Sequence, residues 1–272
     1  MRDTELSASP TRRTAILIPA LNEERAIREV VEGALAVSSV VIVIDDGSTD
    51  ATVERINDLP VTLIRHPRPM GKGAGLRAGF RHALELDVDG VVTMDGDGQH
   101  LASDVPRILA AARQCPDTIV IGARIRNREQ QPSGRRRANA VADWGVSWGA
   151  ATPIADSQSG QRFYPRKMLH LAELQAEDFV FEAALLIASC RELGLGVVSV
   201  PIDSRYEPEF RRSHFRPVRD IARITGYTIG RIIHYGHVVR AYHQGHLPAH
   251  VIDPESLATK AADEASPLLP QQ

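Results

Sequence analysis

The chain has 272 residues, of which 43% are hydrophobic and 24% charged, and this length and apolar content suit one α/β domain with appendages. The formal net charge of -2 gives no overall bias toward nucleic acid, so we expect no nucleic-acid partner. The two cysteines, Cys115 and Cys190, are far apart and lack metal-ligand spacing, which is typical of ordinary thiols in a reducing compartment.

The two ends of the chain differ in composition from its middle. Residues 1–13 are polar, contain no apolar signal segment and are expected to form a flexible arm. Residues 251–272 are rich in Ala, Ser, Pro and Glu, and we predict a disordered tail there. No uninterrupted apolar run is long enough to span a bilayer, so the sequence predicts a cytoplasmic protein, with peripheral attachment to the inner face of the membrane left open.

Short apolar runs alternate with helical patterns through the first half of the chain. Asn22 is a candidate N-cap of the first predicted helix, and Ser48 or Thr49 of the second. Because the strand runs are almost entirely apolar and alternate with helices, they predict a mostly parallel sheet covered on both faces. Strands are predicted at residues 15–19, 40–44, 61–64, 91–94 and 118–121, and helices at 22–37, 51–57, 71–86 and 103–113.

The second half of the chain has a less regular pattern. Residues 124–137 are strongly basic and are predicted to form a loop. A helix at 181–193 and a strand at 197–200 follow. Near the end, residues 218–250 have an amphipathic helical pattern that could pack on the domain or lie in a membrane interface.

These patterns predict a single α/β domain over residues 14–217, with a C-terminal amphipathic helical segment after it. The domain divides into a first half at about 14–123 and a second half at about 124–217. Nothing in the pattern determines the oligomeric state.

Two aspartates separated by one residue, Asp95 and Asp97, follow the predicted strand at 91–94. Ligands of an open α/β sheet gather at the carboxyl ends of its strands. Two carboxylates so close repel each other unless a positive charge lies between them, and Mg²⁺ in proteins is often held by one or two carboxylates plus substrate phosphates. The pair therefore favours a metal–diphosphate site, and a solvated Asp-Gly turn is the alternative.

Three further segments could contribute to the same site. Asp45 and Asp46 end the second predicted strand and could accept hydrogen bonds from a base or a ribose, or could form an Asx turn. Glu23 could contact a ligand or could belong to a helix start. Lys72 lies in a glycine-rich turn that could approach a phosphate, or whose glycines could allow close packing.

Six segments of the chain resemble, in order, those of family-2, A-type glycosyltransferases, and within them the dolichyl- or polyprenyl-phosphate sugar transferases. The segments are IPALNEE, VIDDGSTD, GKGAGLRAG, MDGDGQH, GARIR and DSQSGQRFYP, within a resemblance that covers roughly residues 14–215. The resemblance implies a Rossmann-like A-type fold, a nucleotide-sugar donor, a divalent metal (Mg²⁺ or Mn²⁺) and inversion at the anomeric carbon.

The resemblance also implies roles for the donor-side residues. Pro19, Glu23 and Asp46 match positions that hold the nucleoside in such enzymes. The metal ligands implied by the match are Asp95, Asp97 and, in the lipid-phosphate group, Gln99.

Other matched positions belong to the phosphates and the acceptor. Arg124 and Arg162 match arginines that face phosphates, although either could be a surface ion-pair residue. Ser159 and Gly160 match the turn on the acceptor side. Gln161 stands where an apolar residue is common in the family.

The need for a catalytic base depends on the acceptor. A phosphate acceptor is already ionised near neutral pH, whereas a hydroxyl acceptor needs a base. Asp97, Asp178 and Glu182 are the base candidates, without a ranking among them. Glu182 could instead be a carboxylate at a helix start.

Two basic clusters flank the predicted acceptor region, Arg135–Arg137 and Arg211–Arg216. Either would suit an anionic lipid or a lipid phosphate, and either could be solvated loop charge. We assign Arg212 and Ser213 of the second cluster to the acceptor side.

The sequence thus predicts an inverting, metal-dependent glycosyltransferase that moves a hexose from a UDP- or GDP-sugar to a lipid-linked acceptor. A sugar-phosphate nucleotidyltransferase is one alternative, although its glycine-rich signature normally lies near the N-terminus, where this chain has PALNEE. A non-catalytic partner subunit that binds a nucleotide sugar is another.

Overall fold

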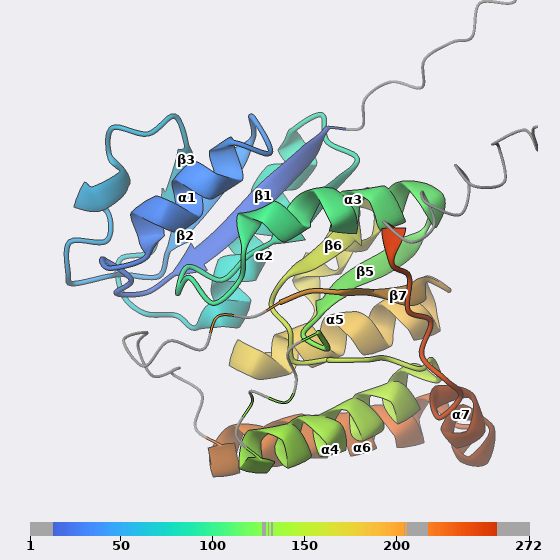
Figure 1. The fold of residues 1–272 in the computed structure, drawn as a ribbon. Helices are drawn as coiled ribbons and strands as arrows, with labels where there is room; N and C mark the ends of the chain where they lie inside the picture. Colours follow the sequence, from blue (N-terminus) through green and yellow to red (C-terminus); the bar gives the residue numbers. More distant parts are fainter. Residues whose placement is uncertain are drawn as a thin grey trace, which may run out of the picture.

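The computed structural model of the protein describes residues 13–126, 129, 131, 133–203, 205 and 217–254. Within these residues a seven-stranded sheet has the order β3-β2-β1-β4-β6-β5-β7 (Figure 1). Neighbouring strands run parallel except at β6, which is antiparallel to both β4 and β5. The strands are β1 (Thr14–Ala20), β2 (Val41–Asp45), β3 (Thr62–Arg65), β4 (Gly90–Thr93), β5 (Thr118–Ala123), β6 (Arg162–Pro165) and β7 (Gly196–Pro201).

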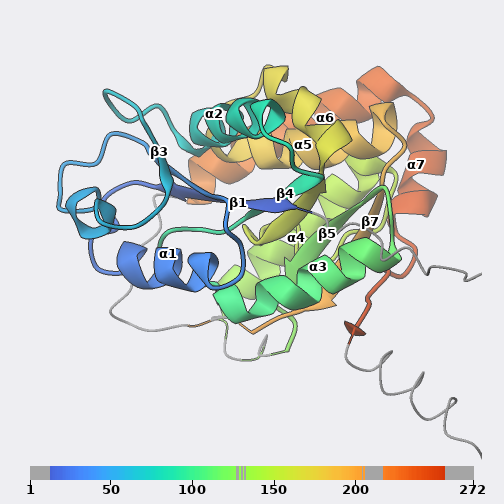
Figure 2. The same ribbon diagram turned by 90° about the horizontal axis from the view of Figure 1, so that it is seen from above.

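Helices cover both faces of this sheet. Figures 1 and 2 show α1 and α3 on one face and α2 and α5 on the other, with α4, α6 and α7 in a further layer beyond α5. The helices are α1 (Ile27–Leu35), α2 (Lys72–Glu85), α3 (Val105–Gln114), α4 (Ser133–Ala150), α5 (Asp178–Glu192), α6 (Pro217–Tyr235) and α7 (Val238–Gly245), with short 3-10 helices at Glu54–Ile56, Ala102–Asp104 and Arg166–Glu173.

The alternation of side chains along β1 divides the core in two. Ile16 and Ile18 belong to the cluster packed against α1 and α3, whereas Leu17 belongs to the cluster that includes Phe80 of α2 and Phe181 of α5. Successive residues of a strand point to opposite faces, so one apolar run fills both cores. The predicted mostly parallel α/β sheet, covered on both faces, is confirmed.

Helix α5 is buried on nearly all sides. Its buried residues form an unbroken run from Ala183 to Ser189, because α5 lies between the sheet and the layer of α4 and α6. A helix that is apolar all round is typical of such a central position.

Both predicted N-caps are wrong. Helix α1 begins at Ile27 rather than near Asn22, and its N-cap residue Ala26 makes no side-chain cap. Asn22 has a φ of 54° and its Oδ1 accepts a hydrogen bond from the Thr49 N–H at 2.7 Å. The predicted helix at 51–57 is only the short 3-10 helix, which has no side-chain cap, and Ser48 Oγ accepts from the Asn22 N–H instead. The two strand-end loops therefore bind each other.

Two further elements differ from the prediction. The segment predicted as a loop at 124–137 ends inside a helix, since α4 begins at Ser133 and includes Arg135–Arg137. Arginine has a high helix propensity, so a run of basic residues does not oppose a helix. Strand β6 was not predicted, because its four residues begin with an arginine, end with a proline and form no apolar run.

The C-terminal segment packs on the domain through α6 and α7. Trp148 Nε1 of α4 donates a 3.0 Å hydrogen bond to the Val238 carbonyl of α7, and Tyr242 packs edge-on against Trp148. No helix of the described ranges is both long and apolar enough to cross a membrane. After α7, Ile252 N–H donates to Ser199 O of β7 at 2.8 Å, so the packed structure extends beyond residue 251, where the tail was predicted to begin.

Candidate functional site

The acidic segments of the chain meet at one edge of the sheet. β1 lies between β2 and β4, so the aspartates that follow these two strands flank the end of β1 at Pro19–Ala20. The approach is close, because a Cβ on Gly96 would lie 3.2 Å from the Pro19 carbonyl oxygen. A Rossmann-like sheet binds its ligands at this carboxyl edge.

Three elements contribute charges to the centre of this edge. Lys72, the first residue of α2, places its Nζ 2.7 Å from Asp95 Oδ1 and 3.2 Å from Glu182 Oε2 of α5. Burial, the largest single influence, would raise the pKa of Asp95, but the charge and hydrogen bond of Lys72, together with the charges of His100 and Arg124, lower that pKa to about 2. Asp95 is therefore an anion across the physiological range, the state in which a carboxylate binds a hard cation.

The other oxygen of Asp95 faces Gly160 and His100. A Cβ on Gly160 would lie 2.2 Å from Asp95 Oδ2, and the Gly160 carbonyl accepts a 2.7 Å hydrogen bond from Thr93 Oγ1. Gly160 thus allows the predicted acceptor-side turn to touch the acidic pair. His100 Nδ1 lies 3.6 Å from the same oxygen, and burial lowers the pKa of His100 to about 4, so its imidazole is neutral at pH 7.

The candidate metal ligands supply oxygen donors only. Asp95 and Asp97 offer carboxylates and Gln99 an amide oxygen, which are the donors that Mg²⁺ and Mn²⁺ prefer. Asp97 Oδ1 accepts a 3.0 Å hydrogen bond from the Gln99 N–H, which keeps the two residues in one turn. The described part of the chain has no cluster of three or more His, Cys, Asp or Glu able to hold a metal.

The two predicted phosphate-binding arginines are engaged within the protein. Arg162 is buried, and its guanidinium donates to the carbonyls of Ser157 and Ser159 at 2.6 and 2.7 Å. Arg124 forms a bidentate pair with Asp156, with distances of 2.8 and 2.7 Å. In this structure both arginines therefore shape the 156–160 turn.

Asp156 is the functional candidate that sequence reasoning missed. It accepts three hydrogen bonds from Arg124, one of them from the backbone N–H at 2.8 Å. Burial raises the pKa of Asp156, but the hydrogen bonds and charge of Arg124 outweigh this and lower it. Its signal was its place at the start of the DSQSGQRFYP segment, to which no role had been given.

Asp46 organises the loop that precedes Lys72. Its carboxylate accepts hydrogen bonds from the N–H groups of Met70 and Gly71 at 2.9 and 2.8 Å, and lies 2.7 Å from His66 Nδ1. Asp45 Oδ1 accepts from the Ser48 N–H at 2.9 Å, which is the Asx-type turn expected as the alternative.

The glycine-rich turn packs closely on α5. Gly71 has a φ of 91°, and a Cβ on it would lie 1.9 Å from Asp178 Oδ1. Asp178 Oδ2 in turn lies 3.0 Å from Arg223 Nη1 of α6. Of the base candidates, Glu182 contacts the Lys72–Asp95 pair, whereas Asp178 is paired with α6.

The remaining predicted residues have varied places. Pro19 is half-buried at the end of β1, and the Glu23 N–H donates to Thr52 Oγ1 at 2.7 Å. Ser159 is fully buried within the 156–160 turn. Arg212 and Ser213 lie outside the described residues.

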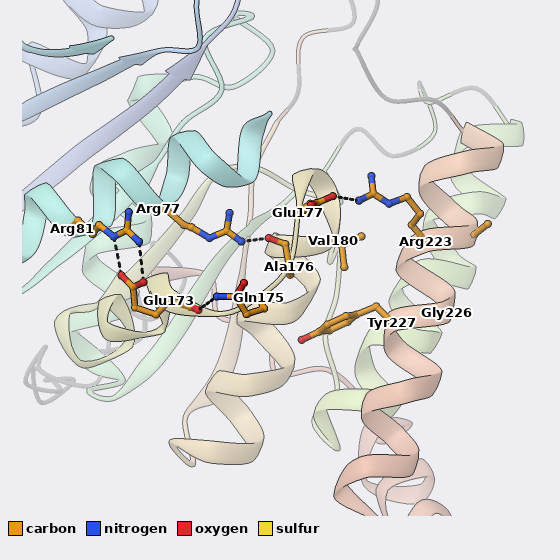
Figure 3. A pocket seen from close by; sticks show the side chains of 11 residues that line it. Arg77, Arg81, Glu173, Gln175, Ala176, Glu177, Val180, Arg223, Gly226 and Tyr227 are labelled. Carbon is orange, nitrogen blue, oxygen red and sulfur yellow. Dashed lines mark hydrogen bonds and ion pairs between the residues drawn. The ribbon is translucent and has the colours of Figure 1, made fainter. Parts of the chain in front are cut away.

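A separate pocket of about 670 Å³ lies between α2, the residues before α5, and α6. Figure 3 shows Arg81 pointing toward Glu173, and Arg223 toward Glu177. Arg81 Nε is paired with Glu173 at 2.8 Å, and Arg223 with Glu177 at 2.9 Å. Arg77 donates to the Leu174 carbonyl at 2.9 Å. These contacts join α2 and α6 to the segment that precedes α5.

The mostly parallel sheet with an acidic carboxyl edge has the architecture of an A-type glycosyltransferase. The family model described as glycosyl transferase family 2 matches residues 15–174, more than half of the chain, and the chain belongs to this family. The protein is therefore a glycosyltransferase, as the sequence predicted, and the match favours neither the nucleotidyltransferase nor the non-catalytic alternative.

Relatives of known name are similar over most of the chain. A UDP-N-acetylglucosamine–dolichyl-phosphate N-acetylglucosaminyltransferase of Methanococcus voltae is 28% identical over 70% of this chain and 85% of its own. A polyprenol monophosphomannose synthase of Mycolicibacterium smegmatis is 30% identical over 71% of this chain and 77% of its own.

A similar solved structure supports the fold. Glucosyl-3-phosphoglycerate synthase from Mycobacterium tuberculosis, crystallised with Mn²⁺, UDP-glucose and phosphoglyceric acid, superposes with a TM-score of 0.62 and 23% identity. The match covers 82% of this chain and 79% of that chain.

Proposed function

We propose that the protein is an inverting, divalent-metal-dependent transferase that moves a hexose from a UDP- or GDP-sugar to a polyprenyl-phosphate or other lipid acceptor. The observation that carries the proposal is the contact of Asp95 with the Gly160 turn at the carboxyl edge of the sheet. That contact joins the candidate metal ligands to the candidate acceptor side. The names of the archaeal and mycobacterial relatives support a lipid-phosphate acceptor and a nucleotide-sugar donor.

The candidate donor site would stabilise a leaving diphosphate by charge. A divalent cation at Asp95, Asp97 and Gln99 would neutralise the negative charge that develops on the diphosphate. The first turn of α2 presents the positive end of the helix dipole to the same anion. Lys72 adds an ammonium group there.

A phosphate acceptor would need no strong base. Glu182 is paired with Lys72 at 3.2 Å and Asp178 with Arg223 at 3.0 Å, so both carboxylates have structural partners. An ionised lipid phosphate can attack the anomeric carbon directly, so this reaction requires no choice among Asp97, Asp178 and Glu182 as the base.

An enzyme with a lipid acceptor must reach the membrane surface. The layer of α4, α6 and α7 has an exposed apolar face that is suited to contact with a membrane. Large apolar side chains are exposed on all three helices, including Trp144 at 46%, Ile233 at 70% and Val239 at 69%. Figure 1 shows these helices together, on the side of α5 away from the sheet. Exposed aromatic and aliphatic residues on amphipathic helices favour the headgroup region of a bilayer. We propose peripheral attachment through this layer.

The test is sugar transfer by the purified chain. Labelled UDP- and GDP-sugars with Mg²⁺ or Mn²⁺ and a membrane lipid extract should give metal-dependent release of nucleoside diphosphate, with label entering the lipid. Asp97→Ala should lose at least about a hundredfold in kcat/KM, as expected for removal of charge stabilisation. The control Asp87→Ala removes an exposed carboxylate just before β4, at the opposite edge of the sheet, and should keep full activity. Full activity in Asp97→Ala would refute the metal assignment.

A further inference from the structure

Lys72 occupies an unfavourable place for a cation. It is the first residue of α2, and the N-terminal end of a helix dipole repels positive charge. Its side chain is only 20% exposed, so water compensates little. The two carboxylates, Asp95 at 2.7 Å and Glu182 at 3.2 Å, hold the ammonium group in place.

The oxygen that Lys72 contacts belongs to a candidate metal ligand. Asp95 Oδ2 is enclosed by Gly160 and His100, whereas Oδ1 faces Lys72. A divalent cation that binds Asp95 would therefore meet an ammonium group already paired with the same carboxylate. Two cations beside one carboxylate repel each other strongly at such distances.

Glu182 offers the ammonium group a second partner. It lies one turn after Asp178 in α5, a helix fixed by burial on nearly all sides. The four-carbon stem of lysine is flexible, so small rotations can move Nζ from between the two carboxylates to one of them.

We propose that Lys72 is a positioning residue that competes with the divalent cation for Asp95, and that Glu182 retains the ammonium group when the cation binds. This inference rests on the proposed function, because it assumes that Asp95 is a metal ligand. If Lys72 competes with the cation in this way, the binding of the metal and the binding of the nucleotide-sugar donor are coupled. A diphosphate at the N-terminus of α2 neutralises Lys72, so nucleotide and metal should each strengthen the binding of the other.

The test is titration of the purified full-length chain with Mn²⁺, followed by the loss of the electron paramagnetic resonance signal of free Mn²⁺, without donor. Lys72→Met should bind Mn²⁺ roughly tenfold more tightly than the wild type, a coupling of ordinary size. Glu182→Gln should bind Mn²⁺ more weakly, because Lys72 then relies on Asp95 alone. The double variant should match Lys72→Met, since Glu182 acts through Lys72.

The control is Lys167→Met, which removes an exposed lysine paired at 2.9 Å with Asp117, next to β5. It should leave the Mn²⁺ affinity unchanged. Addition of UDP should tighten Mn²⁺ binding in the wild type more than in Lys72→Met. Circular dichroism spectra and thermal unfolding show whether each variant is folded.

Three results would overturn the inference. Equal Mn²⁺ affinity of Lys72→Met and the wild type would show that the two cations do not compete. Weakening by Glu182→Gln that persists in the Lys72→Met background would show that Glu182 acts on the metal directly. Absence of Mn²⁺ binding in every variant, both without and with UDP, would refute the metal site itself, and the sugar-transfer assay without metal would then report separately on the glycosyltransferase function.

Discussion

At the scale of residues, the candidate site depends on contacts that leave no space for a side chain. Gly160 lies against the Asp95 carboxylate, and a Cβ there would overlap Oδ2 at 2.2 Å. Its neighbours cannot easily move, because the Gly160 carbonyl is bonded to Thr93 and the turn is held by the buried guanidinium of Arg162. A single methyl group at this position should therefore displace Asp95.

Gly160→Ala is expected to lower kcat/KM for sugar transfer at least tenfold, because about 1.4 kcal/mol of lost transition-state stabilisation already has that effect. Mn²⁺ affinity should fall in parallel. The matched control is Gly134→Ala, where nothing lies within 4 Å of the added Cβ. It should keep full activity and gain up to about 1 kcal/mol of stability from helix propensity. Normal activity in Gly160→Ala would show that the turn yields without moving the acidic pair.

Some residue-scale features could be predicted from the sequence and others could not. The acidic strand ends were visible, because aspartates follow apolar runs at Asp45 and Asp95. The Lys72–Glu182 contact was not, since it joins residues far apart in the chain. The burial of Arg162 could not be predicted either. The sequence does not distinguish an arginine whose guanidinium is enclosed by carbonyl groups from an arginine exposed to solvent.

At the scale of elements, the regular strands and helices of the first half were predictable because their apolar patterns are strong. The missed elements are those whose stability comes from tertiary contacts. β6 has only four residues, and it is held in place by pairing with β4 and β5 on either side. Its own sequence has no pattern that predicts a strand. The first residues of α4 are basic and lack an apolar face. Helix-cap residues were misassigned because Asn22 and Ser48 bind each other's loops.

Helix α5 should be the element most sensitive to truncation of side chains. Leu186 is fully buried between the sheet and the outer helices, so Leu186→Ala should lower the free energy of unfolding by about 2–5 kcal/mol. Leu193, just after the same helix, is 37% exposed, and Leu193→Ala should cost below about 1 kcal/mol. Urea unfolding of both variants measures the difference. Equal losses would contradict the central position of α5.

At the scale of the whole molecule, the asymmetry of the surface bears on the proposed membrane attachment. Ile233 and Val239 are exposed on the layer of α4, α6 and α7. Leu63 is an exposed apolar residue outside this layer, on β3, which is an edge strand of the sheet. Attachment through one face should depend on the first two residues and not on the third.

The double variant Ile233→Glu/Val239→Glu should bind vesicles of anionic and zwitterionic phospholipid at least tenfold more weakly than the wild type, because it places two charges where apolar side chains would enter the headgroup region. Leu63→Glu is the matched control and should bind as the wild type does. Sedimentation with the vesicles measures the bound fraction. Equal binding of all three proteins would show that another surface contacts the lipid.

The antiparallel strand β6 has a consequence for how such enzymes can be recombined. It comes from the second half of the sequence, yet it lies in the middle of the sheet, between β4 and β5 of the first half. The turn that approaches Asp95 is continuous with this strand. A chimera that takes its sequence from one enzyme up to β5 and from a relative after β5 would carry the relative's β6 inside the first enzyme's sheet. An exchange of acceptor preference between relatives must therefore transfer β6 together with β4 and β5.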